Sequence, residues 1–432
     1  MMSSTRKPLT RMARLIAPAI LGLSLSSPLL AEETPKDLPL EELKSFGEVF
    51  ERIKRAYVHD VDDKTLLKNA IRGMLSGLDP HSAYLGPEEF SELQESTQGE
   101  FGGLGLEVGS ENGFIKVITP IDDTPAARAG IKPHDLIIKL DDTPVKGLSL
   151  NKAIEMMRGK PDTDIRLTIV RDGVDGPFEV TLTRALIRVT SVKHQLLEDN
   201  YGYIRITQFQ LHTGEEVEKS LGALYEQTEG KLHGLVLDLR NNPGGVLQAA
   251  VEVVDAFITE GLIVYTEGRL SNSELRFTAT ENNPSQGVPV VILINEGTAS
   301  ASEIVSGALQ DHKRAVIMGT QSFGKGSVQT VLPLASDRAL KLTTALYYTP
   351  SGRSIQAQGV SPDIEVKPAR LTPLEDTLQI KEADLEGHLE NGQNKKESKK
   401  KASNSDLAKQ DYQLFEALSL LKGIHILQPD ND

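Results

Sequence analysis

The residues best suited to chemistry stand in one short segment, Asn295-Glu-Gly-Thr-Ala-Ser300-Ala-Ser-Glu303. An apolar run that we expect to be a strand ends there and a helical pattern begins, and ligands of open α/β sheets bind in such loops. Ser300 and Glu303 also match a Ser-x-x-Glu capping box. Two interpretations stay open for Ser300: a helix cap, or a nucleophile assisted by the Ala301 N–H and the positive end of the helix.

A glycine-rich loop, Asp238-Leu-Arg240-Asn-Asn-Pro-Gly244-Gly245, follows another predicted strand. Glycines allow backbone N–H groups to approach a ligand closely at the start of a helix. Gly244 or Gly245 could therefore donate a second hydrogen bond to an oxyanion. Taken alone, the pair is more typical of a plain turn.

A possible base lies in the segment Ser322-Phe-Gly324-Lys325-Gly326-Ser-Val-Gln329. A surface lysine stays charged, but burial in an apolar pocket lowers the pKa of its amine and makes it a usable base. The Gln329 amide could orient that amine as a third catalytic member does. If the stretch is extended, four residues span ~13 Å, so contact would require a turn at Gly326.

Other catalytic schemes fit the residues less well. The sequence has no Gly-x-Ser-x-Gly elbow, and its nine histidines lie away from an obvious nucleophile loop. It has no His-Glu-x-x-His motif, so we expect neither a catalytic metal nor a cofactor. Ser322 and Lys325 match the Ser-x-x-Lys motif of acyltransferases, but the glycines beside the lysine disfavour the helix on which that motif belongs.

The composition limits the classes of binding partner and the cellular compartment that we expect for this protein. The formal net charge of −14 disfavours nucleic acid and anionic lipid as main partners, because both are bound through phosphate neutralisation. The absence of cysteine excludes disulfides and thiolate metal sites and is compatible with an oxidising compartment.

The first 31 residues have the parts of a secretory signal peptide in order. Basic residues precede an apolar run from Leu15 to Leu30 that is shorter than the roughly 20 residues that comfortably span a bilayer. Cleavage after Ala31 would release the mature chain, and we expect a periplasmic protein.

Changes in sequence texture divide the rest of the chain. The predicted regions are a signal peptide (1–31), a helical region (32–98), a β-rich domain (99–187), an α/β core (188–370), a charged linker (371–410) and a C-terminal helix (411–432). In the core, apolar runs at 234–239 and 288–294 each precede a helical pattern, at 246–257 and 301–309. That alternation is typical of a mainly parallel sheet.

The last helix is predicted from Tyr412 to Leu421, ending near Gly423. Its apolar stripe of Leu414, Leu418 and Leu421 must be covered by another element. The N-terminal helical region also carries apolar residues at helical spacing. For that region a helical cap and an oligomerisation arm are equally good interpretations.

Taken together, the three segments around Ser300, Gly244-Gly245 and Lys325 resemble the C-terminal processing peptidases, also called tail-specific proteases. The resemblance covers nearly the whole mature chain. It implies an α/β multidomain protein with a ClpP/crotonase-like core and an inserted PDZ domain, acting as a serine endopeptidase.

The resemblance also implies roles for individual residues. The family places its nucleophilic serine 25 residues before the base lysine, which selects Ser300 over Ser302 for Lys325. It implies that Gln329 is the third member. An oxyanion hole is implied from Ala301 and one of Gly244 and Gly245.

The peptide-binding loop implied for the PDZ domain is Gly102-Gly103-Leu104-Gly105-Leu106. Such a loop offers N–H groups to a terminal carboxylate while the adjacent strand edge pairs with the peptide. The resemblance further implies peptide substrates and, in some bacterial members, a lipoprotein adaptor of helical repeats and cell-wall hydrolases as substrates. We also expect a homo-oligomer. A catalytically inactive PDZ scaffold and a Ser-x-x-Lys acyltransferase remain the alternatives.

Overall fold

The computed structural model describes residues 38–270, 273–370, 382, 385–389 and 403–427. The predicted signal peptide lies outside these residues, as does most of the predicted linker. The chain divides into two units, residues 1–68 and 69–432. Along the described residues, no helix combines the length and the apolar character needed to cross a membrane.

The first unit is helical. It contains α1 (Leu40–Ala56) and the start of α2 (Asp63–Ser76). None of the side chains of α1 is buried. Its large apolar residues recur at helical spacing and remain exposed: Leu40, Leu43, Phe46, Val49 and Ile53.

The centre of the second unit is a six-stranded sheet in the order β10-β11-β12-β15-β16-β19. Its strands are β10 (Val192–Leu196), β11 (Tyr201–Ile206), β12 (Gly234–Asp238), β15 (Val290–Ile294), β16 (Ala315–Gly319) and β19 (Ile364–Glu365). All neighbours pair in parallel except β10 with β11. The predicted mainly parallel α/β core is therefore confirmed.

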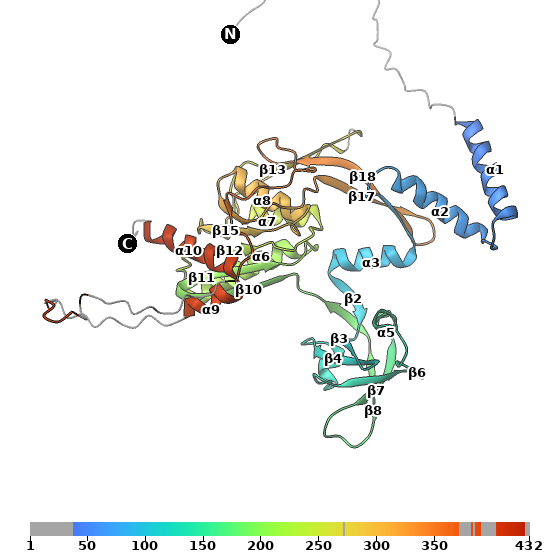
Figure 1. The fold of residues 1–432 in the computed structure, drawn as a ribbon, viewed down its shortest axis with the longest axis horizontal. Helices are drawn as coiled ribbons and strands as arrows, with labels where there is room; N and C mark the ends of the chain where they lie inside the picture. The colour runs from blue at the N-terminus through green and yellow to red at the C-terminus, as the bar shows by residue number, and fades with distance from the viewer. Residues whose placement is uncertain (1–37, 271–272, 371–381, 383–384, 390–402, 428–432) are drawn as a thin grey trace, which may run out of the picture. The chain divides into compact units, whose positions relative to one another are not determined.

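Helices cover both faces of this sheet (Figure 1). One face packs on α6 (Thr213–Gln227), α7 (Leu247–Asp255) and α8 (Ala301–Asp311). The other packs on α10 (Tyr412–Leu427), which follows α9 (Ser403–Gln410). Successive strand residues alternate between the two apolar clusters, so each strand is buried on both sides.

The stripe predicted on the last helix lies against this second face. Leu414, Leu418 and Leu421 are buried there. The helix does not end near Gly423 as predicted but runs to Leu427. A glycine inside a helix is only about 1 kcal/mol worse than alanine, and Lys422 is tied to Glu198 at 2.8 Å.

A second, antiparallel sheet lies beside the core and was not predicted. It consists of β1 (Ala83–Leu85), β13 (Leu262–Gly268), β14 (Arg276–Thr278), β17 (Ser327–Leu334) and β18 (Arg338–Tyr348). Strand β17 begins two residues after Lys325, and β18 runs antiparallel to it. This sheet forms the wall behind the predicted base.

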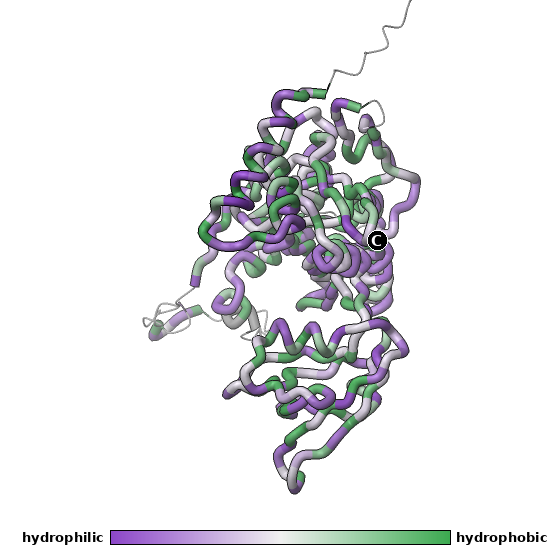
Figure 2. Tube along the Cα trace, turned by 90° about the vertical axis from the view of Figure 1, so that its right-hand side faces the viewer, coloured by the Kyte–Doolittle hydropathy of each residue, from purple (hydrophilic) through white to green (hydrophobic). Residues whose placement is uncertain are grey.

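The β-rich domain has its own apolar core. Its strands are β3 (Leu106–Glu111), β4 (Phe114–Pro120), β5 (Leu136–Leu140), β6 (Thr143–Pro144), β7 (Asp164–Val170) and β8 (Phe178–Thr183), with helices α4 (Pro125–Arg128) and α5 (Leu150–Met157). Hydrophobic and hydrophilic residues alternate along its strands (Figure 2). Helix α3 (Pro87–Gln98) and the paired strands β2 (Glu100–Gly103) and β9 (Ala185–Arg188) connect it to the core.

Candidate active site

One cavity of about 550 Å³ brings together the six residues predicted from the three motifs. Those on its wall are Ser300, Ala301, Lys325, Gln329, Gly244 and Gly245. The cavity lies where the loops after β12 and β15 meet the start of β17. Segments more than 80 residues apart in the chain thus share one site because the carboxyl ends of parallel strands lie along one edge.

Ser300 occupies the residue before α8 with an unusual backbone, φ 58° and ψ −115°. A non-glycine residue in such a region costs of order 1–3 kcal/mol and persists only where its surroundings hold it. Ser300 and Glu303 have the arrangement of a capping box, but the Ser300 hydroxyl makes no hydrogen bond that caps the helix. The Glu303 N–H goes instead to the Ser300 carbonyl, at 2.8 Å. The side chain is thereby free to act on a ligand in the cavity.

Ser302 offers a direct contrast two residues later. Its side chain is fully buried, and its hydroxyl donates to the Asn242 carbonyl at 3.0 Å. Ser302 is absent from the cavity wall, whereas Ser300 is part of it. The geometry therefore favours Ser300 over Ser302 as the candidate nucleophile, as the resemblance does.

The fully buried carboxylate of Glu303 joins the two loops that carry the predicted nucleophile and base. Its Oε2 accepts from the Ser300 N–H at 2.8 Å and from the Lys325 N–H at 2.8 Å. Its Oε1 accepts from the Ser322 hydroxyl at 2.5 Å and the Gly324 N–H at 2.7 Å. The capping-box pattern indicated the first contact, but nothing in the sequence indicated the other three.

Lys325 is half-buried between two buried glycines. Burial, and next the charge of Lys341, lowers the pKa of its amine. Among the described residues the Lys325 Nζ has no hydrogen-bond partner, so no bond yet joins it to Ser300. Catalytic contacts of this kind are often long in a free enzyme and tighten when substrate binds.

Tyr347, on β18, ties the same two loops together from the other side. Its hydroxyl lies at 3.0 Å from the Ser300 carbonyl and also contacts the Lys325 carbonyl. The ring is 2% exposed, and burial raises the pKa of the phenol well above its ordinary value. The phenol therefore stays protonated and can donate a hydrogen bond.

The two glycines proposed for an oxyanion hole differ in what their N–H groups do. The Gly244 N–H donates to Asn242 Oδ1 at 2.9 Å. The Gly244 carbonyl and the Val246 N–H both bond to Phe209, which turns the Gly245 N–H to the opposite side. Within the described chain the N–H groups of Gly245 and Ala301 have no acceptor, so these two are the available donors.

Gln329 shares the cavity but does not contact Lys325. Its Nε2 donates to Ser327 Oγ at 3.0 Å and lies 3.3 Å from Thr343 Oγ1. The chain is already extended from Ser327 onward. The turn required for a direct Gln329–Lys325 contact is thus absent from this arrangement of residues 327–334.

His81 lies close to the predicted base, which nothing in the sequence indicated. His81 precedes β1 and lies near enough to Lys325 that burial, then the Lys325 charge, lowers the pKa of its imidazole. The Asp79 carboxylate organises this loop by accepting from the N–H groups of His81 and Ser82 at 2.7 and 2.8 Å. The Ser82 hydroxyl in turn accepts from the Thr343 N–H of β18 at 3.1 Å.

The predicted peptide-binding loop connects β2 to β3. Gly103 ends β2, Leu104 is buried, Gly105 has a φ of 77° and Leu106 begins β3. No described residue accepts from the N–H groups of Leu104 or Gly105. Strand β3 is the edge of its sheet. Free amides beside an open strand edge are what a peptide carboxylate and backbone require.

Residues 200–366 match the family described as Peptidase family S41. A relative from Bartonella bacilliformis, named carboxy-terminal-processing protease, is 48% identical over 391 residues, 89% of this chain and 89% of the relative. The chain belongs to this family.

Further comparisons extend the match along the chain. Residues 102–182 match the PDZ domain, and residues 25–89 match the N-terminal domain of the activating protease CtpB. A relative from Synechocystis with the same activity in its name is 40% identical over 68% of this chain and 69% of its own. The photosystem II D1 C-terminal processing protease is 31% identical over 76% of this chain and 93% of its own, with a TM-score of 0.44. The chain is a serine-type peptidase with a PDZ domain.

The Ser-x-x-Lys alternative does not fit this protease. The Ser322 hydroxyl is buried, donates to Glu303 and accepts from the Val360 N–H at 2.7 Å. Residues 321–326 are not helical, whereas that motif requires a helix. Within the described residues no group of three or more His, Cys, Asp or Glu side chains could hold a metal ion.

Proposed function

We propose that this protease cleaves peptide bonds with Ser300 as nucleophile and Lys325 as general base. The observation that carries the proposal is one cavity wall that contains Ser300, a lysine whose pKa is lowered by burial, and the unpaired N–H groups of Ala301 and Gly245. Each of these features alone is also compatible with a purely structural role. Their coincidence is what a serine protease without a catalytic histidine needs.

In the proposed reaction, neutral Lys325 takes the proton as Ser300 Oγ attacks the scissile carbonyl carbon. The oxygen of the tetrahedral intermediate becomes negative and is stabilised by the N–H groups of Ala301 and Gly245 and by the N-terminus of α8. Lys325 then protonates the departing amine, which leaves an acyl-enzyme on Ser300. Water, deprotonated by Lys325, releases the acid product.

Gln329 and Gly244 can take part in the proposed reaction only after their present hydrogen bonds break. For Gln329 to orient the lysine amine, its amide must leave Ser327 and Thr343. For Gly244 to donate to the oxyanion, its N–H must leave Asn242 Oδ1. The Gln329 movement requires two hydrogen bonds to break and the Gly244 movement one, each worth about 0.5–1.5 kcal/mol net.

We propose that substrates are recognised through C-terminal or unfolded segments bound by the PDZ domain. The N–H groups of Leu104 and Gly105 would hold the terminal carboxylate, with Gly103 and Leu106 shaping the loop. Val108 of β3 and Ile154 of α5 are partly buried against the apolar core of this domain. An apolar terminal side chain is therefore the one that we propose for the peptide bound at this strand edge.

We further propose a periplasmic location, cell-wall hydrolases as substrates, a helical-repeat lipoprotein adaptor and a homo-oligomer. The predicted signal peptide supports export. The exposed apolar stripe of α1 supports self-association, because a helix with no buried side chain gains stability by covering such a stripe.

The test compares Ser300→Ala with the matched control Ser302→Ala on an unfolded test protein. We expect Ser300→Ala to lose all turnover and Ser302→Ala, whose hydroxyl only supports the Asn242 carbonyl, to keep most of it. Unchanged turnover in Ser300→Ala would contradict the nucleophile assignment, and an inactive parent chain would revive the scaffold interpretation. Capture from periplasm with the Ser300→Ala chain should retain uncleaved substrates and any adaptor.

A further inference from the structure

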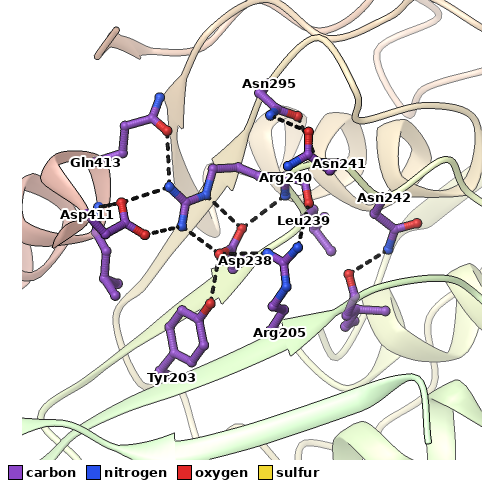
Figure 3. A network of polar contacts seen from close by, with 12 residues as sticks. Tyr203, Arg205, Asp238, Leu239, Arg240, Asn241, Asn242, Asn295, Asp411 and Gln413 are labelled. Atoms are coloured by element: carbon purple, nitrogen blue, oxygen red, sulfur yellow. Dashed lines mark hydrogen bonds and ion pairs between the residues drawn. The ribbon is translucent and has the colours of Figure 1, made fainter. Parts of the chain in front are cut away.

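The N-terminal end of α10 reaches a loop that is remote from it in sequence (Figure 3). Arg240 Nη1 donates to Asp411 Oδ1 at 2.9 Å, and its Nη2 donates to Asp411 Oδ2 at 2.7 Å. Nη1 also donates to Gln413 Oε1 at 3.1 Å. The Gln413 Nε2 is fixed in turn by the Val366 carbonyl at 2.6 Å. Asp411, directly before α10, and Gln413, in its first turn, thus hold one guanidinium.

This guanidinium requires those partners for charge balance. Its side chain is 13% exposed. The fully buried Asp238 pairs with Arg240 at 2.7 Å but also with Arg205 at 3.0 Å, so one carboxylate faces two cations. Asp411 supplies the second negative charge. An unpaired buried cation is strongly destabilising, so loss of Asp411 would move the Arg240 side chain or admit water.

Arg240 begins the loop that ends at the proposed oxyanion donor, Gly245. The Arg240 N–H is bonded to Asp238 Oδ1 at 3.0 Å, and its carbonyl accepts from Arg205 at 3.2 Å. Farther along, Asn242 donates to the Ile206 carbonyl at 2.9 Å. A shift at Arg240 would therefore reach the Gly244-Gly245 peptide through this short segment, since the Gly244 N–H is bonded to Asn242, and catalytic donors lose effect when displaced by about 1 Å.

We propose that Asp411 and Gln413 are positioning residues for the oxyanion side of the active site, acting through Arg240. The C-terminal helix is then part of the catalytic apparatus, although a charged stretch separates it from the protease core. This inference rests on the proposed oxyanion role of Gly245. It requires no contact between the helix and substrate.

The test uses the full chain with Asp411→Asn, which keeps shape but removes the charge. We expect kcat to fall by about 10- to 100-fold with KM within about twofold, because substrate binding does not involve Arg240. Gln413→Met, which removes one bond to Arg240, should cause a smaller loss. The matched control is Lys422→Gln, also on α10. This substitution breaks the ion pair between Lys422 and Glu198 and removes no contact with the loop that begins at Arg240.

Coupling through Arg240 is tested by combining Asp411→Asn with Arg240→Lys. If Asp411 acts through Arg240, the double variant loses little more activity than the worse single variant. Retention of kcat within twofold in Asp411→Asn, or an equal loss in Lys422→Gln, would overturn the inference. Ser300→Ala is assayed beside them. If it remains active, the proposed function fails, whereas if it alone is inactive, only the inference fails.

Discussion

Two buried carboxylates organise opposite sides of the active site in different ways. Glu303, on the nucleophile side, is surrounded by neutral donors: three backbone N–H groups and one hydroxyl. Asp238, on the oxyanion side, accepts from two arginines and from the Tyr203 hydroxyl at 2.8 Å. Both side chains are fully buried.

This difference in charge balance predicts how each side of the active site responds to substitution. The charge of Glu303 is not cancelled by a cation, so it acts on Lys325 and raises the pKa of that amine against the effects of burial and Lys341. The charge of Asp238 is balanced by two arginines, in an ion-pair network that extends through Asp411 to the C-terminal helix. The nucleophile side is therefore sensitive to local charge, and the oxyanion side to helix docking.

The largest effect should come from removing the base on the nucleophile side. Lys325→Arg keeps a positive charge but cannot be deprotonated, so we expect the same loss as in Lys325→Met, about 10²- to 10⁴-fold in kcat. Steady-state cleavage of a peptide measures this. Activity in Lys325→Arg near that of the parent would contradict a lysine base.

Glu303→Gln should lower kcat by about 10²-fold, because each carboxylate oxygen serves two donors and an amide nitrogen cannot accept from them. Stability should also fall, by roughly 1–3 kcal/mol for each donor left unsatisfied. The remaining activity should reach its plateau at lower pH, since the substitution removes a charge that raises the pKa of Lys325. The exposed Glu296→Gln on the same loop is the control, and an equal loss there would remove Glu303 from its organising role.

Tyr347→Phe should reduce kcat by about three- to tenfold. It removes the hydroxyl between the Ser300 and Lys325 carbonyls but leaves the ring packing intact, and a hydrogen bond of this kind is worth about 1 kcal/mol. Tyr348→Phe, the next residue on β18, faces the other side of the strand and should have no such effect. Equal rates for the two variants would show that the bridge is dispensable.

Lys341→Gln should have the smallest effect and the opposite pH direction to Glu303→Gln. Removing this positive charge raises the pKa of Lys325, so less of the amine is neutral at pH 7 and activity falls a few-fold there. The rate should recover fully at alkaline pH. A pH–rate profile for the variant checks this, and a limb that moves to lower pH would show that Lys341 does not act on the base.

Much of the architecture was predictable because apolar runs and glycine turns act locally. The strands near 234 and 290, the helix after Ser300 and the β-rich domain all follow from such patterns. The antiparallel sheet of β1, β13, β14, β17 and β18 was not predicted, since its pairing joins segments whose exposed faces carry little periodicity. The extension of α10 past Gly423 depends on tertiary contacts that outweigh propensity.

The site was predictable as a set of residues but not as a network. The spacing of the motifs indicated Ser300 and Lys325, and the structure places both on the wall of one cavity together with Ala301 and Gly245. The contacts of Glu303 with the lysine loop, and of Arg240 with Asp411, join residues that are 22 and 171 positions apart. No local pattern encodes such pairs, and none indicates that His81 lies near Lys325, because the two residues are far apart in the sequence.

The dyad is tested most directly by the rate at which a fluorophosphonate labels the protease as pH is raised, with the labelled residue located by peptide mapping. We predict a single label on Ser300, a rate that rises with pH as Lys325 loses its proton, and loss of that rise in Lys325→Met. A label elsewhere, or a Ser300 labelling rate that is independent of both pH and Lys325, would contradict the Ser300–Lys325 mechanism.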